Sequence, residues 1–198
     1  MTQTPATPSR RTRLSTEREH ELYEAVLELL REHGYESLTM DAVAARTRAS
    51  KATLYRQWQG KPRLVATALR HAKTAAQPDP DTGSLRGDLL ELARCGMRDA
   101  EHDHALMRGL AHAAHANPEL HQALRELLVL PEAERLEALL QQAVERGEVA
   151  AGTPALEFVP HMFFGAFIGR DLIEGRPPDL DYLTSYLDAV VLPALGIR

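Results

Sequence analysis

The run between residues 50 and 57 has side chains of the types and spacing that contact nucleic acid. If the run is a short helix, Leu54 faces inward, and the outward face comprises Lys51, Ala52, Thr53, Tyr55 and Arg56. Lys and Arg donate to phosphates and guanine edges, Thr and Ala contact the thymine methyl group, and a Tyr hydroxyl reaches a backbone oxygen. The pattern therefore predicts a helix that binds DNA.

Two capping residues position this helix and one before it. Thr39 and Ser50 each stand directly before a helix-forming run, where their oxygens accept from backbone N–H groups of the first turn. Asp41 lies in the first turn of the earlier helix, where the helix dipole favours an acid. The apolar stripe of that helix comprises Met40, Val43 and Ala44. Two short helices joined by a tight turn predict a helix-turn-helix.

Helices this short are unstable alone, so flanking helices must hold them. Upstream, a helix is predicted to end at Gly34, and its stripe comprises Leu22, Val26, Leu29, Leu30 and His33. Downstream, Gly60, Lys61 and Pro62 open another helix, because proline is tolerated in a first turn. Its inward face comprises Leu64, Val65, Ala68 and Leu69.

Three motifs make residues 23–72 similar to a known family. They are His33-Gly34-Tyr35, Thr39-Met40-Asp41-Ala42-Val43-Ala44 and Ser50-Lys51-Ala52-Thr53-Leu54-Tyr55-Arg56. The stretch resembles the DNA-binding domain of tetracycline-repressor (TetR) family regulators. The resemblance implies an all-α homodimer of about nine helices per chain, with N-terminal domains that bind a palindromic DNA operator and C-terminal domains that bind an effector. It also implies DNA contacts from Thr39, Lys51, Thr53, Tyr55 and Lys61, with Lys61 and its helix N-terminus holding a phosphate.

Arg48 departs from the family pattern, which usually has glycine in this turn. Arginine at positive φ is strained by roughly 1 kcal/mol, and we expect a phosphate contact from Arg48, alongside Arg46, to compensate. The full predicted DNA-binding set is Thr39, Arg46, Arg48, Ser50, Lys51, Ala52, Thr53, Tyr55, Arg56 and Lys61.

The charge is divided along the chain. Residues 1–78 contain 13 Lys plus Arg against 8 Asp plus Glu, a net charge of +5, whereas residues 79–198 carry a net charge of −10. We therefore predict a basic DNA-binding domain at 15–78 and an acidic effector-binding and dimerisation domain at 79–198. Residues 1–14 are predicted to be a disordered basic arm, which either follows a minor groove or is merely solvated.

Composition excludes several other classes of protein. A single cysteine, Cys95, rules out an internal disulfide framework and is compatible with a bacterial cytoplasm. The most apolar segment, residues 158–168, is too short to span a membrane and predicts a buried helix. We find no phosphate-binding glycine loop, nucleophile elbow or complete metal-ligand set, so no enzyme activity and no cofactor are expected.

The C-terminal region is predicted to contain five helices after a linker at residues 77–83. Their expected spans are 84–100, 102–115, 118–147, 154–174 and 179–194, with Ser84 as an N-cap and a kink near Leu130, because Pro131 follows. Residues 81–89, 117–120, 135–140 and 143–148 also resemble, more loosely, one C-terminal subfamily of these regulators.

The last two helices carry apolar and small residues at helical spacing, which suits a four-helix dimer interface. The predicted interface comprises Phe158, Met162, Gly165, Gly169, Tyr186 and Val190. Arg170 and Asp171 are expected to pair across the dimer, the alternative being an anchor for a ligand. By family analogy, effector-binding candidates are Leu92, Met97, Met107, Leu110, Leu136, Leu140, Phe163, Phe164 and Phe167, each of which also suits a plain core.

Five histidines lie between residues 102 and 121. His112 and His115 share a helix face and would bind a metal with one more ligand, such as His104 or Glu119. No recognised zinc spacing is completed, so a solvated polar face is the preferred interpretation and no metal is predicted. The sequence as a whole predicts a ligand-responsive repressor, with a helical interaction module that does not bind DNA as the alternative.

Overall fold

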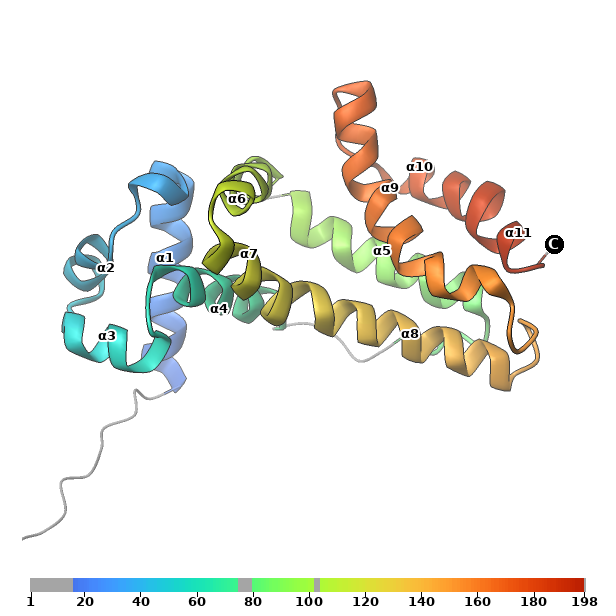
Figure 1. Ribbon diagram of the computed structural model, residues 1–198, viewed down its shortest axis with the longest axis horizontal. Helices are drawn as coiled ribbons and strands as arrows, with labels where there is room; N and C mark the ends of the chain where they lie inside the picture. Colours follow the sequence, from blue (N-terminus) through green and yellow to red (C-terminus); the bar gives the residue numbers. More distant parts are fainter. Residues whose placement is uncertain (1–15, 75–79, 102–103, 198) are drawn as a thin grey trace, which may run out of the picture.

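The computed structural model describes residues 16–74, 80–101 and 104–197, apart from the side chains of 74, 98–101 and 104. Across these ranges the chain is helical and contains no strand, as predicted. The predicted basic arm and part of the predicted linker lie outside the described residues. Figure 1 places α1–α4 at one end and α9, α10 and α11 at the other, with α6 and α7 next to the first group and α5 and α8 running side by side toward the second.

The N-terminal helices are α1 (Thr16–Ser37), α2 (Met40–Thr47), α3 (Lys51–Trp58) and α4 (Lys61–Thr74). Gly34 interrupts α1 with a φ of 74°, where the sequence predicts the end of this helix. Both predicted N-caps are confirmed, because Thr39 Oγ1 accepts from Ala42 N at 3.1 Å and Ser50 Oγ accepts from Thr53 N at 3.1 Å. Each helix of the helix-turn-helix is therefore capped by the side chain of the residue that precedes it.

The core of this end confirms the predicted stripes with one correction. Leu22, Val26, Leu29 and Leu30 of α1 are buried, as are the four predicted apolar residues of α4. His33, predicted to join the α1 stripe, is exposed and lies 3.4 Å from Glu32. Tyr35, after the break at Gly34, is buried in this core instead, so the polar imidazole stays in water.

The C-terminal region begins with α5 (Leu85–Glu101), α6 (His104–Ala116) and α7 (Pro118–Leu124). Leu106, Leu110 and Ala113 of α6 and Leu120 of α7 pack into the same cluster as the apolar residues of α1–α4. The core of the N-terminal end thus includes residues of α6 and α7, which follow the linker in sequence. Helix α6 packs against α1 and helix α7 against α4, so these two helices join the C-terminal region to the N-terminal helices.

The predicted kink near Leu130 is a π-helical turn. The predicted helix at 118–147 is divided into α7, a π-turn η1 (Arg125–Val129) and α8 (Leu130–Glu145). The amide of Leu130 donates to Arg125 O, five residues back. Pro131 has no N–H and its ring crowds the carbonyl four residues earlier, so a widened turn accommodates it.

A second π-turn precedes a second proline in the same way. The last helical segments are the 3₁₀ turn η2 (Pro154–Phe158), α9 (Val159–Glu174), α10 (Leu180–Tyr186), the π-turn η3 (Leu187–Val191) and α11 (Leu192–Ala194). Leu192 N donates to Leu187 O directly before Pro193. Two apolar clusters hold this end together, a larger one from α5, α8, α9 and η3 and a smaller one around Ala93, Ala166 and Leu183.

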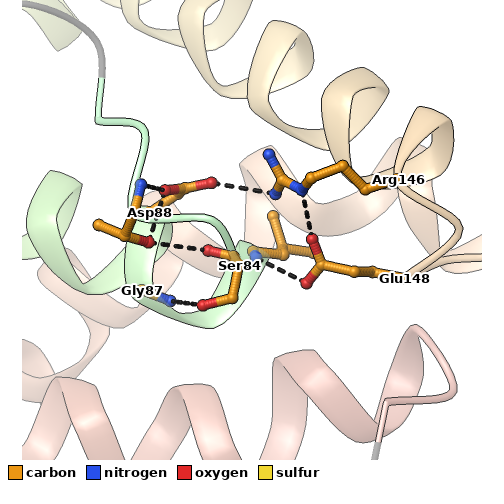
Figure 2. Close-up of polar contacts among 7 residues, drawn as sticks. Ser84, Gly87, Asp88, Arg146 and Glu148 are labelled. Carbon is orange, nitrogen blue, oxygen red and sulfur yellow. Dashed lines mark hydrogen bonds and ion pairs between the residues drawn. The ribbon is translucent and has the colours of Figure 1, made fainter.

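A polar network fixes the start of α5 on the end of α8 (Figure 2). Asp88, fully buried, accepts from Thr82 N and Thr82 Oγ1, both at 2.7 Å, and lies 3.1 Å from Arg146 Nη2. Arg146 Nε donates to Glu148 Oε1 at 2.5 Å, and Glu148 Oε2 accepts from Leu85 N at 2.8 Å. Each carboxylate therefore caps backbone N–H groups and binds the guanidinium, which offsets the cost of burial.

Ser84 and Gly87, in the same segment, each have a structural role at the start of α5. Ser84 Oγ accepts from Gly87 N at 3.2 Å, which confirms Ser84 as the N-cap of α5. A Cβ at Gly87 would lie 2.1 Å from Thr82 Oγ1, so only glycine allows Thr82 to reach Asp88. The loose resemblance at residues 81–89 and 143–148 thus corresponds to one packed structural unit.

Candidate nucleic-acid interface

Helix α3 divides its side chains as the sequence predicts. Leu54 and Trp58 are buried, whereas Tyr55 is 50% exposed. Lys51, Ala52 and Arg56 are exposed, and Thr53 is half-buried. Thr53 Oγ1 lies 2.8 Å from Ser50 Oγ, so the hydroxyls at the N-terminus of α3 are ordered together. The outward face offers two cations, a phenol and small side chains to a groove.

Lys51 has a partner that the sequence did not predict. Its ammonium forms an ion pair with Asp41 in the first turn of α2. The two side chains are 53% and 69% exposed, respectively. Thr39, the N-cap of α2, is also exposed, so the first turns of both helices open onto the same side of the helix-turn-helix.

The guanidinium of Arg46 is paired with two acids of α1 and is not free for DNA. Its guanidinium lies 2.8 Å from Glu32 Oε2 and 3.3 Å from Glu28 Oε2. The hydrogen bond from Arg46 lowers the pKa of Glu32, and the same bond raises the pKa of Arg46. In this conformation Arg46 fixes α2 against α1, so a phosphate contact would have to compete with two carboxylates.

Arg48 has the backbone conformation that its position predicts. Its φ is 53° and its ψ is 30°, and its N–H donates to Ala44 O to close the end of α2. The residue is exposed beside a cleft of about 330 Å³ whose lining residues are Arg18, Glu21, Leu22, Ala25, Arg46, Thr47, Arg48 and Ala49. Arg18 Nη2 donates to Thr47 O at 3.1 Å across this cleft.

Lys61 at the start of α4 is partly engaged within the protein. Its Nζ donates to Tyr35 O at 3.0 Å and lies 4.1 Å from the centroid of the Tyr35 ring. Burial raises the pKa of Tyr35 to about 12, so its phenol is neutral at physiological pH. An ammonium has three donors, which leaves two of the Lys61 donors for a phosphate at the N-terminus of α4.

The effector-binding candidates do not form one pocket. Leu92, Leu136 and Leu140 belong to the larger C-terminal cluster, Met97, Phe163 and Phe167 surround the smaller one, and Leu110 lies in the core shared with α1–α4. Phe164 is half-buried, and Met107 is 41% exposed on α6. Among the described side chains, Phe163 is the one candidate that lines the cavity between α5, α9 and α10, whose volume is about 10 Å³.

Besides the predicted dimer residues, α9 exposes two apolar side chains that the sequence analysis missed. Phe158 and Val190 are 50% and 40% exposed. Gly165 is exposed, whereas Met162, Gly169 and Tyr186 are half-buried, and Met162 and Tyr186 pack on the core. Leu172 and Ile173 were not predicted, yet each is 84% exposed, and Ile168 is 69% exposed. Their apolar character was visible in the sequence, but their direction was not.

Arg170 and Asp171 form ion pairs within the chain, and the expected pairing across a dimer stays a prediction. Arg170 is 6% exposed, its Nη1 lies 2.8 Å from Asp179 Oδ2, and its guanidinium stacks 4.3 Å from the Tyr182 ring centroid. Asp171 lies 3.5 Å from Arg108 of α6. Asp179 and Arg108 are near enough in the folded chain to pair with Arg170 and Asp171, respectively, without a second subunit.

Other candidate sites carry less chemistry. Among the residues that the structure describes, no three His, Cys, Asp or Glu side chains gather as a metal-binding group, and His102 lies outside those residues. Cys95 is half-buried on α5. In the described ranges, no helix is both long and apolar enough to cross a membrane.

Comparisons with known proteins identify the family. Residues 22–68 match the family described as "Bacterial regulatory proteins, tetR family", and residues 79–190 match "Tetracyclin repressor-like, C-terminal domain". An uncharacterised HTH-type transcriptional regulator of Mycobacterium tuberculosis is 39% identical, covering 90% of this chain and 88% of its own. A DNA-binding transcriptional repressor TetR of Mycobacteroides abscessus is 34% identical, covering 86% and 90%, respectively.

A solved structure agrees with these relatives. The crystal structure of the TetR family transcription regulator SCO0332 matches with a TM-score of 0.69 and 29% identity, covering 92% of this chain and 99% of that one. Its likeness extends over both the helix-turn-helix and the C-terminal helices. The chain belongs to the tetracycline-repressor (TetR) family of DNA-binding transcriptional regulators.

Proposed function

We propose that the protein is a homodimeric repressor that binds a palindromic operator and is released by an apolar or amphipathic small molecule. The observation that carries the operator contact is the outward face of α3, with Lys51, Tyr55 and Arg56 exposed over the buried Leu54 and Trp58. Side chains of these types bind phosphates and base edges in the major groove.

The homodimer is supported by the apolar surface of α9. Ile168, Leu172 and Ile173 are each at least 69% exposed. Ile168 and Leu172 are four residues apart and share a face of α9, and exposed apolar surface of this kind marks an interaction site. One α3 of eight residues reads few base pairs. Two copies held about 34 Å apart, or at a multiple of that spacing, read a palindrome with multiplied affinity.

Release by a ligand is supported by the packing of α6 and α7. These two helices belong to the C-terminal region and contribute four buried side chains to the core of α1–α4. A ligand that binds between the C-terminal helices would act through this contact on the separation of the two DNA-binding ends. It lowers operator affinity only by its preference for the conformation that binds DNA less well.

The test is selection of bound oligonucleotides from a random double-stranded pool by the purified protein and by Tyr55→Ala. The parent is expected to enrich a palindrome that the variant fails to enrich, although both fold and dimerise. The enriched site then becomes a probe for small molecules that dissociate the complex. A folded parent that enriches no sequence would instead favour a helical interaction module that does not bind DNA.

A further inference from the structure

The ion pair between Asp41 and Lys51 is not needed to hold the helix-turn-helix together. Both side chains are more than half exposed, and pairs in water contribute little to folding. Each helix is already capped, α2 by Thr39 and α3 by Ser50. The helix dipole favours an acid in the first turn of α2, but it does not require the carboxylate to lie against the first cation of α3.

The position of Asp41 is also unfavourable for binding phosphate. The surface around the first turns of α2 and α3 is the one proposed above to face DNA, whose backbone carries dense negative charge. A carboxylate there reduces attraction to any DNA sequence, and by pairing with Lys51 it withdraws one cation from phosphates. The carboxylate compensates this cost at the DNA surface when it meets a donor that DNA presents at some sequences and not at others.

The two groups together match the major-groove edge of a G·C pair. Lysine donates to guanine O6 and N7, and aspartate accepts from the N4 amino group of cytosine. A thymine would place its O4 acceptor and methyl group against the carboxylate, which is repulsive. Adenine N6 would also donate to the carboxylate, but the acceptors of an A·T pair, adenine N7 and thymine O4, lie on opposite sides of that amino group. An A·T pair therefore does not offer lysine the two adjacent acceptors of guanine. A donor and an acceptor that are already adjacent need little rearrangement to bind both bases.

We propose that Asp41 is a specificity residue, and that the Asp41–Lys51 pair reads one G·C pair in each half of the operator. Asp41 accepts from cytosine N4 while Lys51 donates to guanine. The inference rests on the operator binding proposed above and adds an acidic side chain of α2 to the contacts of α3.

The proposal predicts that an Asp41 variant binds unrelated DNA more tightly and loses sequence specificity. Asp41→Asn and Asp41→Ala both remove a negative charge near DNA and release Lys51 for phosphates. Binding to unrelated DNA should therefore become tighter, by about threefold, because one repulsive charge is lost. Preference for G·C at one half-site position should fall from about tenfold, within the range of a good side-chain pair, to less than twofold. A variant that merely destabilised α2 would lose affinity and all preferences together.

The experiment is selection from the random pool, at one salt concentration, with the parent, Asp41→Asn, Asp41→Ala and the matched control Asp181→Asn. Asp181 is also an exposed acid in the first turn of a helix, but on α10. Affinities for the parent site and for each single-position change then complete the comparison. Circular dichroism melting checks that every variant folds.

The expected result is loss of the G·C preference at one position per half-site in both Asp41 variants, with other positions and the Asp181 control unchanged. Asp41→Asn is further expected to gain adenine there, because asparagine pairs with adenine N6 and N7. An unchanged profile in the Asp41 variants would overturn the proposal, as would an even weakening at all positions. If the parent itself enriches no palindrome, the operator function fails first and this inference fails with it.

Discussion

The two ends of the molecule expose opposite chemistry. At the helix-turn-helix, apolar side chains such as Leu54 and Trp58 are buried, and the exposed face of α3 is polar and basic. At α9, Leu172 and Ile173 are 84% exposed, while the charged Arg170 is buried and Asp88 of α5 is buried completely. The polar side chains of α3 are solvated when the protein is alone, and their positive charge suits a polyanion. The apolar side chains of α9 are exposed to water at a cost in free energy, which another apolar surface would remove by covering them.

Loss of the proposed dimer contact at α9 should have the largest effect. Leu172→Glu combined with Ile173→Glu places two charges on the proposed interface, and we expect a monomer in sedimentation equilibrium. Operator affinity should fall about 100-fold or more, because the second DNA-binding end no longer binds in the same complex. Tyr55→Ala is the converse control, since it should remain dimeric and lose DNA binding. A double variant that sediments as a dimer would move the interface away from α9.

Removal of the buried acid should have the next largest effect, on stability. Asp88→Ala leaves Thr82 N without its acceptor, leaves Thr82 Oγ1 with only Ser84 O, and removes one partner of Arg146. We expect the free energy of unfolding in urea to fall by about 3 kcal/mol, the lower end for breaking a buried pair, because Arg146 keeps Glu148. The exposed acid Asp81 is the matched control, and Asp81→Asn should change stability little. Equal midpoints for the two variants would refute a structural role for the network in Figure 2.

A change in the turn of the helix-turn-helix should have a smaller effect, with a gain in stability and a loss of operator affinity. Arg48→Gly relieves a positive φ and should raise the free energy of unfolding by up to about 1 kcal/mol. The same change should weaken operator binding and make the dependence of log affinity on log salt shallower by about one, if Arg48 contacts a phosphate. Binding titrations from low to high salt measure the slope. Identical affinity at every salt concentration would exclude that contact.

The smallest effect concerns acid stability at the N-terminus of α10. The hydrogen bond from Tyr182 N lowers the pKa of Asp179, and the hydrogen bond from Arg170 lowers it further. A carboxyl whose pKa is lower in the folded state than its ordinary 3.8 stabilises the fold above that value. This stabilisation is lost as the pH falls through the lower folded pKa.

Asp179→Asn keeps an oxygen for the cap and removes the charge. The parent should therefore be slightly more stable than the variant at pH 6, and the difference should shrink as the pH falls below 3.8. Urea midpoints measured from pH 6 to pH 2 follow the difference. A gap that stays constant over this range would mean that the Asp179 charge does not contribute.

Much of the helix-turn-helix could be predicted because its determinants are local. Thr39 and Ser50 cap helices through N–H groups three residues away, and the tight turn forces Arg48 into a positive φ whatever surrounds it. The kink before Pro131 was predictable for the same reason, since a proline disturbs only the preceding turn. The sequence predicted the place of the kink but not its form as a π-turn.

The partners of charged and apolar side chains were decided by the tertiary structure. Arg46 reaches acids 14 and 18 residues earlier, Lys61 reaches the carbonyl of Tyr35, and Asp88 meets Arg146 across 58 residues. Periodicity assigned each of these residues to a helix face but gave no information on which other helix would lie opposite. Likewise, apolar spacing could not separate the buried residues of α9 from Leu172 and Ile173. By itself the sequence therefore determined helices, caps, turns and family, because these depend on hydrogen bonds within a few residues and on short motifs; only packing decided which side chains bind one another and which remain exposed for a partner.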